Sequence, residues 1–595
     1  MNPALEKRLK RQVIGKAHRF LAVVPLGFEQ TFVNELECIR REARDDNQAR
    51  RESQPTELGM TESKALEQPQ IVGDGKVEFT AKITDAWKAV AYSRITNRVL
   101  MHIADFKAEN FRELEKKASE IPFELYLTTN HQPLITIHVT CKHSRLYHSD
   151  AIEERLQKII SKTFSSLDPS TPVFHASAQD DKIAKPQSEA TSPLKASETS
   201  DLIAHRSYLQ HLYVTLIDDR CTIWLDLAGE ELYKRGFERF VNDAPLKETI
   251  AAAMIFEALH MAKQQEGDTP QPRHLSSSVQ QRNSFSSKKS LDPIDASHLQ
   301  DDSCVYPLDD TSENLQDDII AKSQSEHRER PHTSHLTALI DPMSGSGTFS
   351  LEAACIASNI IPGVCRDFAL KHQPAFKEAT WKHILDERRK TKDERWETKE
   401  LQVVRRGDEF TSDSHNENHC KNERFIKIIT GDISERSIEI IKHNVECSPL
   451  ASVTPTPINP QLKDFFSYSA QEIAEICERA STSPCDGDKT SESGSVPIIV
   501  LNPPYGKRLD FDAPKLYTKI GKKIADLARE LKAFNMPLTI AILAPKDDSR
   551  PGSKYTCTAN LLRECPALAP NKNSTAKLIE TSHGGFSLNV FIAKI

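Results

Sequence analysis

At 595 residues the chain is long enough for two or three domains, each with its own hydrophobic core. Hydrophobic residues make up 38% and charged residues 27%, a mixture typical of folded domains interrupted by polar segments. No stretch approaches the ~18 consecutive apolar residues of a spanning helix, and the charged N-terminus lacks the apolar run of a secretory signal.

Twelve cysteines are scattered along the chain without a Cys-x-x-Cys pair. This pattern argues against a structural zinc site and gives no disulfide framework. We therefore expect a cytoplasmic protein with no metal and no membrane partner.

The net charge of −7 is concentrated in one part of the chain. Residues 264–333 contain 7 Lys or Arg against 13 Asp or Glu, so the rest of the chain is close to neutral. A neutral body can still carry a basic face, so the acidic balance does not exclude an RNA partner.

Several polar stretches lack periodic apolar residues and are predicted to be inserts, because they cannot bury enough surface to offset their ordering entropy. They are approximately residues 44–70, 176–204, 264–333, 405–423 and 480–495. The acidic stretch 264–333 is the longest, and we expect it to be disordered.

The first half, about residues 17–230, is predicted to contain small α+β modules. Strands are expected in 19–29, 76–81, 97–106, 133–142, 211–218 and 221–229, and helices in 30–42, 84–94, 110–120 and 150–164. A connecting helix with the sequence APLKET is expected within residues 231–263.

The second half, residues 334–595, alternates strands and helices, which predicts a parallel, doubly wound α/β sheet. Its expected strands are 336–340, 424–430, 496–501 and 538–545. The chain then closes with two strands within 576–595, joined at a Gly-Gly pair that is typical of a hairpin.

The motif DPMSGSGT (Asp341 to Thr348) lies between a predicted strand and a predicted helix. Gly345 and Gly347 allow a tight turn and a close approach of a ligand to the backbone. A dinucleotide fingerprint would need a third glycine where this chain has Ser350. The helix N-terminus could instead face the carboxylate of an amino-acid-like cofactor, although a glycine turn without a ligand is also possible.

Asp432 follows the strand predicted at 424–430, and Asp464 follows the segment PTPINP, whose prolines make a third strand there uncertain. Asp432 stands where an acidic residue usually receives ribose hydroxyls, and Asp464 stands where a base could be contacted. An N-cap or loop aspartate explains each of them equally well from the sequence alone.

The motif NPPYG ends the strand at 496–501. Two prolines stiffen the loop and leave carbonyl groups free to accept hydrogen bonds, Asn502 adds a side-chain acceptor, and Tyr505 adds a flat ring. This combination suits a planar group with an exocyclic NH₂, whether on a base or in a side-chain amide. Acceptance of both N–H groups by Asn502 and the Pro503 carbonyl would aim the nitrogen lone pair outward.

These motifs together resemble a known family. The segments RGFERFVNDAPLKETIAAAM, DPMSGSGTFSLEAACIASNIIPG, RDFALKHQPAF and NPPYGKRL resemble, in order, the THUMP-domain 23S rRNA guanine-(2-amino) methyltransferases of bacteria. The segment PLITIHVTCKHSRLYHSDAIEERL is similar to the family's RNA-binding THUMP region. The resemblance implies a class I S-adenosylmethionine-dependent methyltransferase with a Rossmann-like, seven-stranded sheet, preceded by ferredoxin-like and THUMP modules.

The family usually has cysteine where this chain has Ser344, and some relatives carry a second fused methyltransferase domain. Only about 90 residues follow Tyr505 here, so we expect one active site and one reaction.

The resemblance also implies roles for the motif residues. The cofactor S-adenosylmethionine would be bound by Asp341, Met343, Gly345, Gly347, Thr348, Asp432, Ile433 and Asp464. The target guanine of large-subunit rRNA, or of its precursor, would be held by Asn502, Pro503, Pro504 and Tyr505. Lys142 and Arg145 are candidates for phosphate contacts, and a solvated polar edge explains them equally well.

Three other functions share parts of this pattern. An adenine-amine methyltransferase has the same Asn-Pro-Pro-Tyr motif but ordinarily brings a target-recognition domain. A protein glutamine methyltransferase usually has a small helical N-terminal domain. An RNA-binding assembly factor with a degenerate methyltransferase fold is disfavoured by the intact motifs at Gly345, Asp432 and Asn502.

Overall fold

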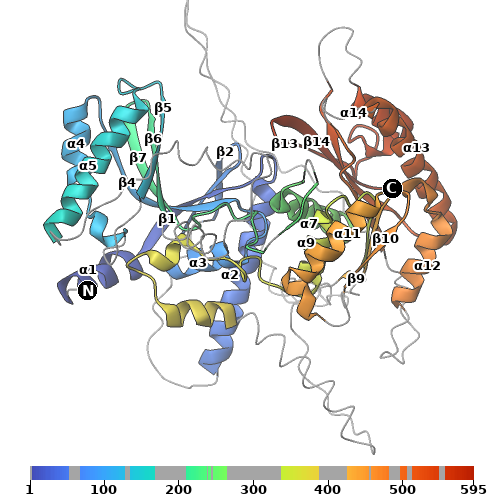
Figure 1. Cartoon of the computed structure of the whole chain (residues 1–595), viewed down its shortest axis with the longest axis horizontal. Helices are drawn as coiled ribbons and strands as arrows, with labels where there is room; N and C mark the ends of the chain where they lie inside the picture. The colour runs from blue at the N-terminus through green and yellow to red at the C-terminus, as the bar shows by residue number, and fades with distance from the viewer. Residues whose placement is uncertain are drawn as a thin grey trace, which may run out of the picture. The chain divides into compact units, whose positions relative to one another are not determined.

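A computed structural model gives the structure of the chain (Figure 1). It describes residues 3–52, 68–127, 135–167, 209–237, 239–242, 245–263, 337–386, 425–453, 457–481, 496–505, 512–547 and 556–595. The predicted inserts at 176–204, 264–333 and 405–423 lie outside these residues. Most of the inserts at 44–70 and 480–495 lies outside them as well.

The described strands of the first half form one seven-stranded sheet in the order β2-β3-β1-β4-β7-β6-β5. Neighbouring strands are antiparallel except for β5 and β6, which are parallel. The strands are β1 (Ala17–Val23), β2 (Gln70–Gly73), β3 (Lys76–Lys82), β4 (Arg98–Lys107), β5 (Ile135–Lys142), β6 (Gln210–Ile217) and β7 (Arg220–Asp226). The expected α+β modules therefore share a single sheet.

Five α-helices accompany this sheet: α1 (Pro3–Leu9), α2 (Glu29–Glu52), α3 (Ile83–Tyr92), α4 (Phe111–Ser119) and α5 (Ser149–Leu167). Leu9 and Val13 are buried in the hydrophobic core, so the packed structure begins before the predicted boundary at residue 17. Helix α2 also continues to Glu52, past the predicted start of the polar insert at residue 44.

The second sheet has the order β10-β9-β8-β11-β12-β14-β13. Its strands are parallel except β14, which is antiparallel to both of its neighbours. They are β8 (Thr337–Asp341), β9 (Phe425–Asp432), β10 (Ile458–Leu462), β11 (Val496–Leu501), β12 (Thr539–Pro545), β13 (Lys577–His583) and β14 (Phe586–Lys594). This seven-stranded sheet ending in an antiparallel hairpin is the one predicted from the sequence.

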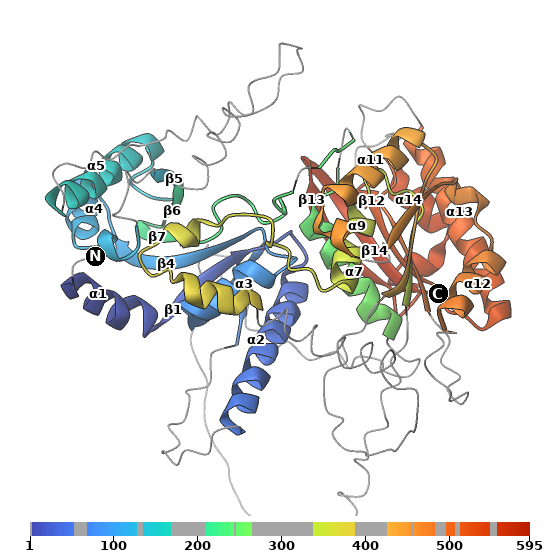
Figure 2. The ribbon, with the colours of Figure 1, turned by 60° about the horizontal axis from the view of Figure 1, so that its bottom comes forward.

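Helices cover both faces of the second sheet (Figure 2). One hydrophobic cluster joins the sheet to α7 (Glu248–Lys263), α9 (Thr348–Ala357) and α11 (Glu435–Glu446). The other joins it to α12 (Ala470–Ser481), α13 (Ala513–Leu531) and α14 (Cys557–Glu564). The expected connecting helix is thus α7, which packs on this sheet. None of the helices in the described ranges is long and apolar enough to cross a membrane.

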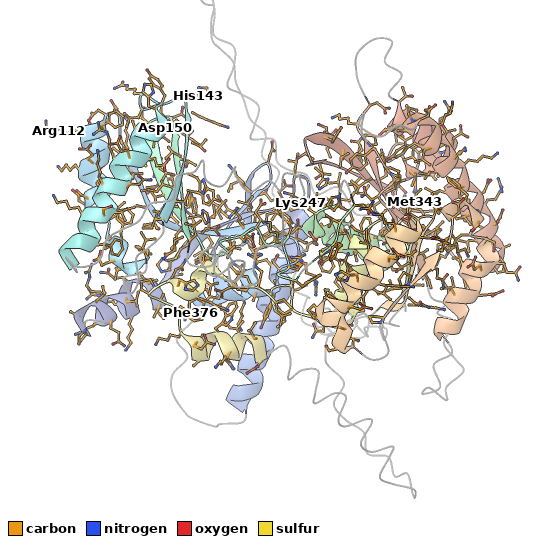
Figure 3. The ribbon with its side chains drawn as sticks, viewed as in Figure 1. Arg112, His143, Asp150, Lys247, Met343 and Phe376 are labelled. Atoms are coloured by element: carbon orange, nitrogen blue, oxygen red, sulfur yellow. The ribbon has the colours of Figure 1, made fainter. Side chains whose placement is uncertain are left out.

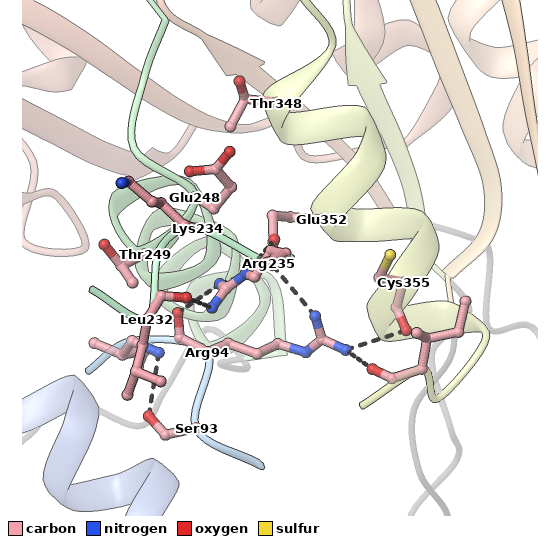
Figure 4. Close-up of polar contacts among 12 residues, drawn as sticks. Ser93, Arg94, Leu232, Lys234, Arg235, Glu248, Thr249, Thr348, Glu352 and Cys355 are labelled. Carbon is pink, nitrogen blue, oxygen red and sulfur yellow. Dashed lines mark hydrogen bonds and ion pairs between the residues drawn. The ribbon is translucent and has the colours of Figure 1, made fainter. Parts of the chain in front are cut away.

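A buried carboxylate links the first half of the chain to α9 (Figure 4). Glu352 on α9 accepts from Arg235 Nε at 2.9 Å and from Arg94 Nη1 at 3.2 Å. The side chains of these three residues are at most 7% exposed. Arg235 also donates to the carbonyl oxygens of Leu232 and Arg94, each at 2.9 Å, so the guanidinium groups are well supplied with acceptors.

We predict that Glu352→Ala destabilises the protein by about 3–5 kcal/mol, because it leaves two buried guanidinium groups without their carboxylate. Thermal and urea unfolding of the wild type and of Glu352→Ala would measure the loss in free energy of unfolding. Glu154→Ala is the matched control, since Glu154 forms a solvent-exposed pair with Lys158 whose loss should have little effect. Equal effects of the two substitutions would contradict the prediction.

Candidate active site

The strand order of the second sheet reverses beside β8, so the carboxyl ends of β8 and β11 form a topological switch point. From β8 the chain continues to β9 and β10 on one side, and β11 returns to pair with β8 on the other. Ligands of open α/β sheets bind at such a switch point. The two motifs singled out in the sequence, DPMSGSGT and NPPY, follow these two strands.

The loop after β8 has the backbone shape that its glycines predict. Gly345 has φ +54° and Gly347 has φ +80°, both in the left-handed region. A Cβ at Gly347 would lie 3.0 Å from Ile441 on α11, so this position needs glycine for space as well as for conformation. A Cβ at Gly345 would meet only the Asn242 amide, at 3.9 Å, so the backbone there is open to a ligand.

Asp341 ends β8 and is fully buried. Its Oδ2 accepts from Ser350 Oγ at 2.7 Å and from Ser350 N at 3.2 Å, and Thr430 Oγ1 in turn donates to Ser350 Oγ. Its Oδ1 is buried and has no hydrogen-bond partner within the described ranges. Burial raises the pKa of Asp341 to about 7, against the effect of the Ser350 hydrogen bonds, and nearby Asp432 adds to the increase.

Asp432, at the end of β9, cross-links two loops. One carboxylate oxygen accepts from Gly345 N at 2.8 Å and the other from Ser434 N at 2.9 Å. Ile433 beside it is 71% exposed, which is unusual for a large apolar side chain and makes it available to cover a flat ligand. A carboxylate has about four acceptor sites, so Asp432 can still receive further hydroxyl groups.

Asp464 follows β10 and is exposed. Its side chain accepts from Phe466 N at 3.0 Å and caps a short 3₁₀ helix, so the local capping role has a direct structural basis. Met343 lies half-buried in the loop after β8 and packs against the second cluster of the sheet (Figure 3). Thr348 is buried at the start of α9, where its hydroxyl receives a hydrogen bond from Arg239 at 3.2 Å.

The Asn-Pro-Pro-Tyr segment follows β11 and carries two acceptor groups. Asn502 Oδ1 is buried and has no hydrogen-bond partner among the residues that the structure describes. Pro503 is buried, and its carbonyl lies 3.5 Å from Tyr517 OH, whose closer partner is the Leu543 carbonyl at 3.1 Å. Pro504 is exposed. Two carbonyl-type acceptors therefore follow one another at this strand end.

The ring of Tyr505 is held by the hairpin of β13 and β14. This contact was not predicted from the sequence. Tyr505 OH lies 3.3 Å from His583 Nδ1, at the end of β13. Phe586, at the start of β14, meets the Tyr505 ring edge-on with centroids 6.0 Å apart. Burial lowers the pKa of His583, and the charge of Lys247 lowers it further. His583 is therefore favoured as the neutral ring.

The segment before α7 also reaches the loop after β8. Asn444 on α11 is fully buried; its side chain accepts from Phe240 N at 2.8 Å and donates to the carbonyls of Phe240 and Ser346. Asn242 Nδ2 donates to Ser437 Oγ at 3.3 Å. These contacts hold residues 239–242 along the glycine loop. The only sequence signal for them is that the segment RGFER precedes the motif DPMSGSGT in the chain.

The two phosphate-contact candidates lie far along the chain from these loops and differ from each other. Arg145 forms ion pairs with Glu109 and Asp219, and its backbone N–H donates to Asp219 Oδ1 at 2.7 Å. Lys142 is exposed at the end of β5, on the strand that forms one edge of the first sheet. The ion pairs of Arg145 thus explain its presence structurally, whereas Lys142 has no comparable contact within the described ranges.

No group of three or more His, Cys, Asp or Glu side chains within the described parts of the chain is placed to hold a metal ion. The buried side-chain atoms without a partner among the described residues include Asp341 Oδ1 and Asn502 Oδ1, at the ends of β8 and β11.

Solved structures share this architecture. The chain superposes with a TM-score of 0.52 on SMU.472, a methyltransferase candidate crystallised with SAH, at 17% identity and with 97% of this chain and 98% of that one covered. A predicted N6-adenine-specific DNA methylase of Listeria monocytogenes gives 0.50 at 18% identity, covering 97% and 96%. The fold is that of a class I methyltransferase.

Sequence comparisons narrow the relationship. Residues 333–452 match the family model described as an RMKL-like methyltransferase domain. The chain is 23% identical over 487 residues to the ribosomal RNA large subunit methyltransferase K/L of Allochromatium vinosum, covering 80% of this chain and 45% of that protein. It is 22% identical to a candidate RNA methyltransferase, YpsC of Bacillus subtilis, covering 83% and 80%.

The chain is thus related to the K/L family of ribosomal RNA large subunit methyltransferases, as its motifs indicated. It spans less than half the length of the curated K/L proteins of Allochromatium vinosum and Psychromonas ingrahamii.

The raised pKa of Asp341 makes the stability of the folded protein depend on pH. Between about pH 4 and pH 7 the folded state holds a proton on Asp341 that the unfolded state has lost, so this carboxyl group increasingly disfavours folding as the pH rises through that window. Asp341→Asn removes the titration. The thermal midpoint of the variant should therefore rise relative to the wild type between pH 4 and pH 8, by an amount that corresponds to roughly 4 kcal/mol at most.

Asp150→Asn, an exposed position on α5, is the control. If the difference in midpoint between Asp341→Asn and the wild type is independent of pH, Asp341 does not titrate in this window.

Proposed function

We propose that this protein transfers a methyl group from S-adenosylmethionine to the exocyclic 2-amino group of a guanine in 23S rRNA. The proposal rests on the class I methyltransferase fold, the relationship to the K/L family and the chemistry of the Asn-Pro-Pro-Tyr segment. The expected partner is large-subunit rRNA or its precursor, and the expected compartment is the cytoplasm.

The proposal is supported above all by Asn502 Oδ1, which is buried and has no hydrogen-bond partner among the described residues. Buried polar atoms are nearly always hydrogen-bonded, so an open acceptor at the switch point calls for a donor from outside the chain. An exocyclic amino group supplies such a donor. The Pro503 carbonyl next to it would accept the second N–H, and the ring of Tyr505 would pack on the flat face of the base.

This arrangement accounts for the chemistry without a strong base. The lone pair of an amino group on guanine is delocalised into the ring, so the nitrogen is a poor nucleophile. When Asn502 and Pro503 accept its two N–H groups, the nitrogen becomes more pyramidal and its lone pair points away from them. The ammonium formed by methyl transfer is strongly acidic and gives its proton to water.

The cofactor would be held by the loops after β8, β9 and β10, and it would supply the electrophilic methyl group. The open backbone at Gly345 gives a path to a ligand, and the unpartnered Oδ1 of Asp341 fits the ammonium of its methionine end. Asp432 would receive ribose hydroxyls, while Ile433 and Asp464 would flank the adenine. Met343, Gly347 and Thr348 would shape the floor of this site.

The base must leave its stack to reach Asn502. Extruding a paired base costs a few kcal/mol, so an unpaired or strained position in the rRNA is the favoured target. An adenine 6-amino group presents the same two N–H groups, and for this reason the reaction product must be identified chemically.

The first test is methyl transfer from radiolabelled S-adenosylmethionine to unmodified large-subunit rRNA, followed by nucleoside digestion. We expect label in 2-methylguanosine. Asn502→Ala should lower the rate by about 10²–10³-fold, because it removes an acceptor that acts mainly in the transition state. Cofactor affinity, measured by calorimetry, should be unchanged in the variant.

Label in methyladenosine would overturn the guanine assignment, and label in protein amides would overturn the RNA assignment. Failure of the wild type to bind the cofactor would favour an RNA-binding assembly factor.

A second prediction concerns the support of Tyr505. Phe586→Ala removes the edge-on contact, which is worth about 0.5–1.5 kcal/mol, so methyl transfer should slow by up to about tenfold with cofactor affinity unchanged. Leu578→Ala, at an exposed position on β13 of the same hairpin, should have no effect. If Phe586→Ala transfers methyl groups at the wild-type rate, the hairpin does not position Tyr505.

A further inference from the structure

The turn between β13 and β14, from His583 to Phe586, lies beside the Asn-Pro-Pro-Tyr segment, and we call it the hairpin tip. His583 and Phe586 face each other in the strand register, with Gly584 (φ +59°) and Gly585 (φ +82°) between them. A Cβ added at either glycine would meet no described atom within 4 Å. The described chain therefore leaves open space around the turn.

Phe586 presents an exposed aromatic ring next to the ring of Tyr505. It is 38% exposed, and its plane lies at 74° to that of Tyr505. A base that is turned out of its stack no longer lies parallel to its neighbour in the strand. Two nearly perpendicular rings thus suit an extruded base on Tyr505 and the next base on Phe586.

Helix α7 runs alongside this hairpin and begins near its tip. At the far end of the hairpin, Lys577 Nζ lies 2.8 Å from Glu257, and Lys594 Nζ lies 3.4 Å from the Ala262 carbonyl. From Glu257 back to Lys247 the chain advances about 15 Å, and from Lys577 to His583 β13 advances about 20 Å in the same direction. This places Lys247 at the level of the hairpin tip (Figure 3).

Lys247 is a cation without a counter-charge. Its ammonium lies 4.5 Å from the centre of the Tyr233 ring, and it forms no ion pair with any residue of the described chain. Arg366 fixes the loop that carries this ring, because it donates to three of the loop's carbonyl groups at 2.6–2.8 Å. The carboxylates around Tyr233 have other partners: Glu248 pairs with Arg239, Glu230 with Lys234, and Glu231 with Tyr233 itself.

Helix stability does not explain a lysine at this position. Lys247 immediately precedes α7, where the helix dipole disfavours a positive charge. Its charge also reaches the hairpin tip, since it adds to the effect of burial in lowering the pKa of His583. An anion bound there would be attracted by a charge that nothing in the described chain neutralises.

We propose that Lys247 and the hairpin tip bind the nucleotide next to the target guanine, with its base stacked on Phe586 and the phosphate between the two nucleotides paired with Lys247. Unstacked bases bind to aromatic side chains, and the strand that carries them binds to cations. This inference rests on the proposed function, because it takes RNA to be the substrate. It adds a contact to the flanking nucleotide, by which the site distinguishes a base within a strand from a free amine.

The first test measures kcat and KM for methyl transfer to unmodified large-subunit rRNA at several salt concentrations. We expect Lys247→Ala to raise KM about tenfold with kcat nearly unchanged, because a phosphate contact is made equally before and during the reaction. The slope of log KM against log salt should fall by about 0.7, the contribution of one phosphate on a single strand. Lys247→Arg should restore both values, since it returns the charge.

Two variants of Phe586 separate stacking from support of Tyr505. Phe586→Leu stays apolar but loses the flat ring, so KM for rRNA should rise at least about fivefold, whereas Phe586→Tyr should retain the wild-type KM. A change confined to kcat would leave Phe586 only as a support of Tyr505 and would overturn the proposed stacking. Lys519→Ala, at an exposed position on α13, and Leu578→Ala are the controls and should leave KM unchanged.

A second measurement needs no methyl transfer. Anisotropy of a fluorescent large-subunit rRNA transcript, with S-adenosylhomocysteine present, gives Kd for the full chain at each salt concentration. Lys247→Ala should bind more weakly, with the slope of log Kd against log salt again reduced by about 0.7. An unchanged Kd and slope, or an equal change in Lys519→Ala, would contradict the inference.

The outcome is separable from that of the proposed function. If Lys247→Ala weakens RNA binding as expected but the wild type transfers no methyl group to rRNA, the inference holds and the proposed function fails. If rRNA is methylated while Lys247→Ala keeps the wild-type KM and slope, the reverse is true. If the label enters protein amides and RNA does not bind, both fail.

Discussion

The buried carboxylate of Glu352 holds the helix after the glycine loop against two guanidinium groups. A charge removed from water is tolerated only when its partners and hydrogen bonds are complete, and here two guanidinium groups supply them. Arg94 comes from the first half of the chain, Arg235 from the segment before α7, and Glu352 from the helix that follows the glycine loop. Since no member can shift without leaving a buried charge unpaired, this cluster fixes α9, and with it the loop at Gly345 and Gly347.

Beside that helix, the loops of the second sheet are joined by one carboxylate. Gly345 and Ser434 both donate their N–H groups to Asp432, which ties the loops after β8 and β9 together. Asp341 and Asn502, by contrast, each have a buried oxygen that no residue of the described chain satisfies. Both stand at the switch point of the sheet. Other buried polar atoms without a partner, such as Gln210 Oε1 and Thr539 Oγ1, lie within strands, so it is the position of Asp341 and Asn502 at the strand ends that distinguishes them.

The sequence predicted the parts of this structure that depend on local pattern. Alternating apolar runs located most strands of both sheets, and the glycine spacing predicted the left-handed turn at Gly345 and Gly347. Features that depend on distant contacts were not predictable. Helices α12, α13 and α14 were not predicted individually, although each has an amphipathic pattern. His583 and Phe586 meet Tyr505 only because β13 and β14 fold back beside β12, and nothing in their own segment indicates that contact.

Substrate choice poses a problem that the active site alone does not solve. Two adjacent acceptors and a ring fit any planar group with an NH₂, so Asn502, Pro503 and Tyr505 favour a type of nitrogen rather than a particular molecule. Selectivity must then come from surfaces that contact the substrate elsewhere. On the proposed function, the second sheet would supply a general amine chemistry, and the choice of amine would fall to surfaces outside its active site.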